Sequence, residues 1–159
     1  MFQIDWLDRH MVHCNLMAEW VYQAFPYEYA EQTLASWQQV FADGQHDGQW
    51  KCLIAMAQGQ LLGGATLARS DLESRPELGP WLACVYVTPA ARRRGIAARL
   101  IEGICEQAQA TGSPTLYLHT YDQRDYYRTL GWQVVEPFEA WGRVHWLMSR
   151  SLNADYQRP

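Results

Sequence analysis

The sequence has few of the features that mark secreted, disulfide-bonded or membrane proteins. No apolar run approaches the ~20 residues that a membrane-spanning helix needs. The opening residues, MFQIDWLDRH, contain no basic segment followed by an apolar core, so no secretory signal is visible. The cysteines are widely spaced and form no C-x-x-C pair, which argues against a disulfide framework: Cys14, Cys52, Cys84 and Cys105. We therefore expect a cytoplasmic protein that does not act at a membrane.

An excess of basic charge is missing as well. The chain has 13 Lys and Arg against 17 Asp and Glu, a formal net charge of −4. No overall basic field exists to attract nucleic acid, which we therefore do not expect as a partner. The length of 159 residues, with 48% hydrophobic and 19% charged residues, is typical of a single globular domain over 1–159.

The hydrophobic pattern predicts alternating helices and strands. Apolar residues recur at helical spacing in four segments, at 6–26, 29–44, 92–110 and 122–131. Six apolar runs bounded by turn residues read as strands, at 50–57, 61–68, 80–87, 115–120, 132–137 and 143–152. The predicted order is ααββ-β-α-β-α-ββ, an α/β (α+β) fold with helices packed on a mixed sheet.

One basic cluster interrupts this acidic chain. The segment VYVTPAARRRGIAARLI places Arg92, Arg93, Arg94 and Gly95 where the third predicted helix begins. Backbone N–H groups at a helix start have no partner within the helix, and the helix dipole favours an anion there. Arginine side chains add charge-assisted hydrogen bonds, and a glycine lets a phosphate approach closely. We interpret the cluster as a phosphate site; the alternative is a solvated helix start.

Two motifs here resemble those of the GNAT superfamily of N-acetyltransferases. The first is V-x-P-x-x-[QR]-x-x-G-x-[GA], filled by Val87, Pro89, Arg92, Gly95 and Ala97. The second is YYRTLGW, from Tyr126 to Trp132, about 30 residues further on. The motifs cover Leu82 to Trp132, while the first 80 residues agree only in layout. The resemblance implies a mostly antiparallel sheet of about six strands, flanked by about four helices.

The resemblance implies acetyl-CoA as cosubstrate. Its pantetheine arm is expected along the strand at Val85–Val87, and its pyrophosphate on the amides from Arg93 to Ala98. The strands Trp81–Val87 and Thr115–His119 are expected to splay apart and admit it. The implied cofactor-binding residues are Val85, Tyr86, Val87, Arg92, Arg93, Arg94, Gly95, Ile96, Ala97 and Ala98.

The resemblance also implies acetyl transfer to an amine by direct attack, with Tyr127 as general acid and amides near Val85–Val87 as oxyanion donors. We expect the neighbouring Tyr126 to be a packed aromatic residue. Two positions depart from the family: Thr120 replaces an asparagine found in some relatives, and the strand LACVYV lacks a carboxylate that many members use as a base. The base is left open between a water chain, His119 and Glu77.

The acceptor is expected to be a primary amine of a small molecule or a peptide. In this fold it generally lies between the first two helices and the final hairpin, here FPYEYAE and EPFEAWGR. Carboxylates with aromatic walls suit a cationic amine, although solvated surface loops explain these segments equally well. The candidate substrate-binding residues are Tyr27, Glu28, Glu139 and Trp141. The acceptor's identity, the use of other acyl-CoAs and a homodimer are left open.

Three alternative functions of the chain make different predictions about ligand binding. His10, His13 and Cys14 have a spacing compatible with a metal, but only three ligands are in view, so we expect no metal. A non-catalytic acyl-CoA-binding or sensor module would bind CoA without turnover. A protein-interaction domain, suggested by the 8 tryptophans, would not bind CoA at all.

Overall fold

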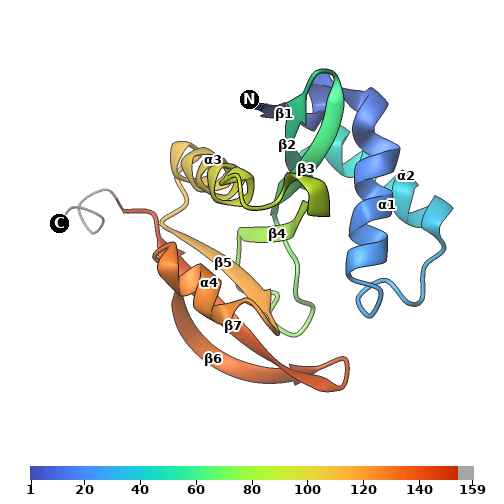
Figure 1. Cartoon of the computed structure of the whole chain (residues 1–159). Helices are drawn as coiled ribbons and strands as arrows, with labels where there is room; N and C mark the ends of the chain where they lie inside the picture. Colours follow the sequence, from blue (N-terminus) through green and yellow to red (C-terminus); the bar gives the residue numbers. More distant parts are fainter. Residues whose placement is uncertain (154–159) are drawn as a thin grey trace.

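The computed structural model describes residues 1–153 and builds them around one seven-stranded sheet (Figure 1). The strands are β1 Gln3–Trp6, β2 Trp50–Ala57, β3 Gln60–Ala68, β4 Trp81–Val87, β5 Thr115–Thr120, β6 Gln133–Ala140 and β7 Arg143–Ser151. The helices are α1 Cys14–Ala24, α2 Leu34–Asp47, α3 Ile96–Ala110 and α4 Arg124–Thr129. Short 3₁₀ turns cover Leu7–Arg9, Met11–His13 and Pro89–Ala91.

The strand order is β1-β2-β3-β4-β5-β7-β6, and every neighbouring pair is antiparallel except β4–β5. This confirms the predicted mixed, mostly antiparallel α+β fold. The sheet has one strand more than predicted, because β1 pairs with β2 at one edge. Four residues are too few to show strand alternation in the sequence.

The first predicted helix was wrong over its first two turns. Trp6 is held extended opposite Leu53 in β2. The chain then crosses from the sheet edge in two 3₁₀ turns, and α1 begins only at Cys14. The buried Leu7 had contributed to the apparent helical period, although it packs from a turn.

Several other helix ends also differ from the prediction, and α2 starts at Leu34, capped by Thr33, rather than at residue 29. Helix α2 continues past Gly44, which packs against Trp50, and ends at Gly48 in the left-handed conformation. Helix α3 starts at Ile96 rather than Arg92, because Arg93 and Gly95 have φ of 67° and 76° and form a turn. Helix α4 starts at Arg124 rather than at residue 122, and the Gln123 amide just before it donates to the Thr120 hydroxyl.

The helices cover both faces of the sheet. Helices α1 and α2 pack on one face through Met17, Val21, Trp37 and Phe41. On the opposite face, α3 buries a row of residues spaced four apart, and α4 adds Tyr127 to the same core: Ile96, Leu100, Ile104 and Ala108. Burial of such apolar stripes is the main favourable term for these helices.

The sheet is split at its centre. Strands β4 and β5 share a single paired position, Trp81 opposite Tyr117, and then diverge (Figure 1). A bulge in β4 lies nearby: Cys84 has φ of 55°, and the register with β3 shifts between Gly64 and Thr66. Successive side chains of a strand normally point to opposite faces of the sheet. The extra residue at the bulge interrupts this alternation, so the neighbours Ala83 and Cys84 pack on the same face. The split leaves the inner edge of β4 without a strand partner beyond Trp81.

Candidate functional site

A cavity occupies the split between β4 and β5. Strands β4 and β5 line it, together with the α1–α2, β3–β4 and β5–α4 loops and helix α4. Its lining residues are Phe25, Tyr27, Glu28, Tyr29, Asp71, Leu82, Ala83, Cys84, Val85, Leu118, His119, Thr120, Tyr121, Asp122, Gln123 and Tyr127. The cavity thus collects polar side chains from segments that are far apart in the sequence.

The arginine loop opens directly onto α3. The first amide bonded within the helix is that of Arg99, to the Gly95 carbonyl, so the amides of Ile96, Ala97 and Ala98 precede the helical ladder. A Cβ built on Gly95 meets nothing within 4 Å, which leaves open space above this backbone. An unobstructed backbone at the N-terminus of a 15-residue helix has the geometry of an anion cradle.

The three arginines of the loop differ in their contacts. Arg92 donates from Nε to the Val87 carbonyl at 3.0 Å and thereby ties the loop to β4. Arg94 donates to the Ala90 carbonyl at 3.5 Å, and all three side chains are exposed. Within residues 1–153 none of the three forms an ion pair with a carboxylate. Their positive charge is therefore available to an anionic ligand.

The two tyrosines of α4 occupy opposite environments. Tyr126 is 38% exposed, so its expected role as the packed aromatic was wrong. Tyr127 is 9% exposed, packs near Trp132 and lines the cavity. Burial, with smaller effects of Tyr126 and Asp122, raises the pKa of Tyr127 above its usual value. Its hydroxyl therefore keeps its proton at neutral pH.

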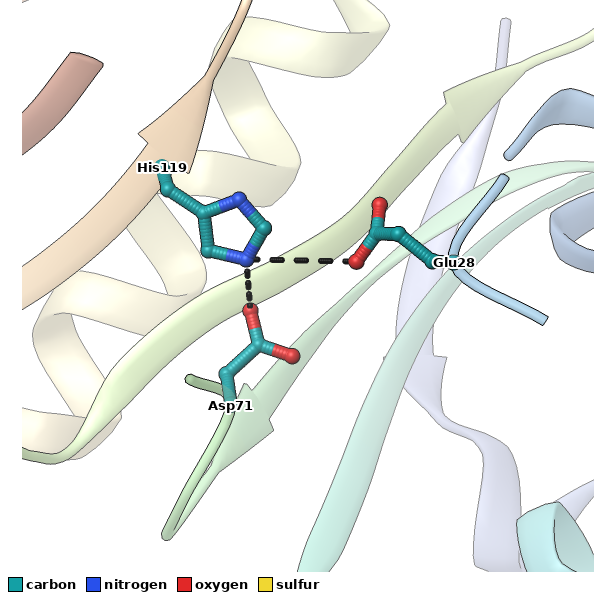
Figure 2. A group of neighbouring side chains, drawn as sticks. All are labelled: Glu28, Asp71 and His119. Atoms are coloured by element: carbon teal, nitrogen blue, oxygen red, sulfur yellow. Dashed lines mark ion pairs between the residues drawn. The ribbon is translucent and has the colours of Figure 1, made fainter. Parts of the chain in front are cut away.

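Three titratable side chains of the cavity lining meet (Figure 2). His119 projects from β5, Glu28 from the α1–α2 loop and Asp71 from the β3–β4 loop. The Nε2 atom of His119 lies 3.0 Å from Asp71 Oδ2 and 3.9 Å from Glu28 Oε1. The side chains are 5%, 11% and 16% exposed for His119, Asp71 and Glu28, so Glu28 is the most accessible.

Burial and mutual charge shift the pKa values of this cluster. Burial raises the pKa of Glu28 to about 7, assisted by Asp71 and opposed by His119. Burial also raises the pKa of Asp71, against the effect of His119. Burial alone would lower the pKa of His119, but the Asp71 and Glu28 carboxylates outweigh it and the pKa is raised. Perturbed groups gathered in a cleft mark a functional site.

Aromatic rings surround the cluster. Trp141 stacks on His119 with ring centroids 5.8 Å apart, and its own φ of 51° places it in the two-residue β6–β7 turn with Gly142. Tyr27 contacts both Trp141 and Tyr121 at centroid distances of 5.6 and 5.8 Å. The guanidinium of Arg143 lies 4.4 Å from the Tyr121 ring centroid, so this aromatic group already holds a cation.

The structure brings together some of the predicted acceptor residues and not others. Glu28 and Trp141 lie next to His119, and Tyr27 contacts Trp141. Glu139 is exposed on β6, where it pairs with Val144 of β7, and its neighbours in the strand face the other side of the sheet. It does not line the cavity. Glu77 is exposed and ion-paired with Arg75, which lowers its pKa. Thr120 lines the cavity, but its hydroxyl already accepts a hydrogen bond from the Gln123 amide.

Two polar residues of the site were missed from the sequence. Asp71 lies in a loop that carries no motif, and only its contact with His119 distinguishes it. His145 is fully buried beneath Trp141, and among residues 1–153 neither ring nitrogen has a hydrogen-bond partner of good geometry. No local pattern identifies either residue, because both depend on the path of distant strands.

The spacing of His10, His13 and Cys14 does not produce a metal cluster. His10 Nε2 lies 2.9 Å from Asp5 Oδ2, and Cys14 is buried in the core against α2. In the part of the chain that the structure describes, one group of three potential ligands has its donor atoms within 4.8 Å of one another: Glu28, Asp71 and His119. None of the helices described is both long and apolar enough to cross a bilayer.

The sequence is similar to a known protein family and to a curated protein. A family model described as the acetyltransferase (GNAT) family matches residues 14–132. N-alpha-acetyltransferase 80 from Mus musculus is 33% identical over 75 residues, which is 47% of this chain and 24% of that protein's length. The chain therefore matches about a quarter of this curated relative.

Solved structures share the fold at low sequence identity. An aminoglycoside 6′-N-acetyltransferase complexed with coenzyme A has a TM-score of 0.76 at 17% identity, with 99% of each chain covered. The structure of yncA from Salmonella typhimurium, with its cofactor acetyl-CoA, has a TM-score of 0.72 at 17% identity, with 96% of this chain and 95% of that chain covered.

Proposed function

Because this chain belongs to the acetyltransferase (GNAT) family, we propose that it transfers the acetyl group of acetyl-CoA to a primary amine of a small molecule or peptide. The observation that carries the proposal is the split between β4 and β5, with an open helix N-terminus at one end and a titratable cluster at the other. A thioester lying along β4 would have its carbonyl between these two ends.

The cofactor-binding residues fit a CoA phosphate and pantetheine. The amides of Ile96, Ala97 and Ala98 and the unpaired arginines supply donors for the pyrophosphate. The edge of β4 that faces the split offers backbone groups at Val85–Val87 to the pantetheine amides, as an added strand would. The bulge at Cys84 redirects this edge and supports the assignment of nearby amides as oxyanion donors.

Tyr127 is the proposed general acid. In acetyl transfer the amine nitrogen bonds to the thioester carbonyl carbon and the carbon–sulfur bond breaks. The departing thiolate then takes a proton. Tyr127 lines the cavity and remains protonated at neutral pH, as a proton donor must.

Glu28 is the proposed acceptor of the amine's proton, directly or through water. It is the most exposed member of the cluster, and its pKa of about 7 matches the requirement for a base that works near neutral pH. Asp71 and His119 act as positioning residues behind it. The exposed, ion-paired Glu77 does not line the cavity, which removes the support for it as the base.

The aromatic rings and carboxylates favour an acceptor that is cationic before it reacts. The names of similar proteins indicate an aminoglycoside amine in one case and an α-amine in the other, so they do not select one acceptor. A panel of aminoglycosides, alkylamines and peptides, assayed for CoA release with acetyl-CoA, tests the proposal. Turnover of any amine supports an enzyme; CoA binding without turnover across the panel supports a binding module, and absence of CoA binding contradicts both.

A further inference from the structure

The Glu28–Asp71–His119 cluster has a second property besides its proposed role with the amine. It presents one imidazole nitrogen and two carboxylates to a shared point, from three separate segments of the chain (Figure 2). Imidazole with carboxylate oxygens is a donor set that suits zinc(II) and related divalent transition ions. From this arrangement we propose that the cluster binds a zinc(II) ion, which competes with the acceptor amine for the same place.

The spacing of the donor atoms agrees with this assignment. Zinc bonds of about 2.0–2.2 Å in tetrahedral geometry hold two ligand atoms roughly 3.3–3.5 Å apart. His119 Nε2 lies 3.0 Å from Asp71 Oδ2 and 3.9 Å from Glu28 Oε1, on either side of that value. The third pair, the Asp71 and Glu28 oxygens, lies within 4.8 Å, so side-chain movements of up to about 1 Å bring all three atoms onto one ion.

The environment of the His119 Nε2 atom is an independent observation in favour of a bound cation. Its side chain is 5% exposed, and Nε2 is buried without a hydrogen bond of acceptable geometry, despite its closeness to Asp71. A buried polar nitrogen without a partner costs free energy unless something satisfies it. Nε2 points toward both carboxylates in Figure 2, so a cation between them would satisfy it.

Three protein ligands leave a fourth position open. Sites with three protein ligands and one exchangeable position are the usual form of accessible zinc centres. The fourth position faces the cavity, since Glu28, Asp71 and His119 all line it. A bound ion would neutralise the carboxylates that attract the amine, so it is expected to inhibit competitively against the acceptor and not against acetyl-CoA.

Direct binding tests the site without depending on the proposed reaction. Titration calorimetry of the purified full chain with Zn²⁺, and with Mg²⁺ as a harder ion, should show one zinc site and weaker magnesium binding. His119→Gln and Asp71→Asn should each weaken zinc binding by more than about 10-fold, since even disturbing a partner of a ligand costs that much. His46→Gln, which alters an exposed histidine on α2, should leave binding unchanged.

A second measurement separates this site from binding by cysteine. Cys84 also lines the cavity, with Sγ 3.4 Å from the Tyr29 hydroxyl. Cobalt(II) in place of zinc should give the absorption of a four-coordinate ion without a thiolate charge-transfer band, in the parent and in Cys84→Ser alike. Circular dichroism and thermal unfolding of each variant identify any that fails to fold, and the other substitution then carries the test.

The outcomes decide the proposal. Absence of zinc binding, parental zinc affinity in both cluster variants, or a thiolate band lost in Cys84→Ser would each overturn the assignment. Where an amine turns over, zinc inhibition that acetyl-CoA relieves and the amine does not would also overturn it. If no amine turns over, the calorimetry still decides the metal site, so failure of the proposed function and failure of this inference remain distinct.

Discussion

Tyr127 shows how one buried hydroxyl can be assigned a chemical role. Its ring packs in the core with α3, and its position on the cavity wall separates it from the exposed Tyr126 one residue away. Adjacent helical residues point in different directions, so the pair provides its own control.

Replacement of Tyr127 by phenylalanine should lower kcat while leaving acetyl-CoA affinity nearly unchanged. The lost hydroxyl acts on the departing thiolate, an interaction made in the transition state rather than in the bound substrate. We expect a loss of about 10²-fold, the low end for a general acid, because a thiolate is a good leaving group. Steady-state kinetics of Tyr127→Phe beside Tyr126→Phe measure it, and equal near-parental kcat values would assign proton delivery to water.

Glu28 should give the reaction its pH dependence. As the proposed base it must be ionised, so kcat/KM should rise with pH through about 7, the pKa that burial imposes on it. Glu28→Gln should lower kcat/KM and remove this rising limb. Glu31→Gln, which alters an exposed acid of the same loop, should keep both the rate and the limb; a limb that persists in Glu28→Gln contradicts the assignment.

The same carboxyl should affect stability in the opposite direction. Its pKa rises from 4.5 in the unfolded chain to about 7 in the folded one, so the folded protein binds the extra proton between these pH values. Stability from this group is full below about pH 4.5 and falls as pH rises to about 7, by an upper limit of about 3 kcal/mol. Urea unfolding of Glu28→Gln should show a smaller loss between pH 5 and pH 8 than that of the parent.

At the scale of elements, the turn before α3 matters more than the helix itself. Arg93 and Gly95 both take positive φ, and this bend leaves the first amides of α3 pointing into open space. The 15-residue helix supplies the aligned dipole behind them. A side chain at Gly95 would occupy the place where the proposed pyrophosphate lies.

Gly95→Val should abolish CoA binding while preserving the fold. The matched control lies at the other end of the same helix: Gly112 also has positive φ, 90° against 76°, and also has nothing within 4 Å of a built Cβ. Both valine substitutions carry the backbone strain of about 1 kcal/mol or more. Calorimetry with CoA should show lost binding in Gly95→Val and parental affinity in Gly112→Val. Normal binding by Gly95→Val would show that the loop does not hold the pyrophosphate.

On the scale of the whole molecule, the sheet consists of two parts that meet at one paired position. The part from β1 to β4 leads into the arginine loop, and the part from β5 to β7 ends in the β6–β7 hairpin (Figure 1). A ligand that contacts both walls of the split adds contacts where the sheet has few of its own.

Acetyl-CoA should therefore raise the melting temperature. At 100 times its Kd, a ligand that binds only the folded state contributes about 2.7 kcal/mol, which corresponds to a rise of roughly 5–10 °C in a chain of this size. Differential scanning fluorimetry measures the shift, and the adenine-nucleotide half of CoA alone should give a smaller one. An unchanged melting temperature at millimolar acetyl-CoA would contradict the proposed function.

The sequence by itself determined the parts of this protein that depend on neighbours in the chain. The order of elements from α1 to β7, the arginine loop ahead of α3 and the Tyr127 motif all follow from local periodicity, turn residues and motif spacing. Local patterns did not predict the four-residue edge strand β1, which forms because it pairs with β2. They also placed the start of α3 too early, because Arg93 and Gly95 adopt positive φ and form a turn there instead of a helix.

The tertiary structure alone decided the titratable cluster at the cavity. Glu28, Asp71 and His119 lie in three segments separated by more than forty residues each, and no spacing rule connects a loop aspartate to a strand histidine. Their pKa values, the stacking of Trp141 on His119 and the removal of Glu139 and Glu77 from the site all depend on how the strands place these side chains. Desolvation and charge coupling act through space, so they appear only once the chain is folded.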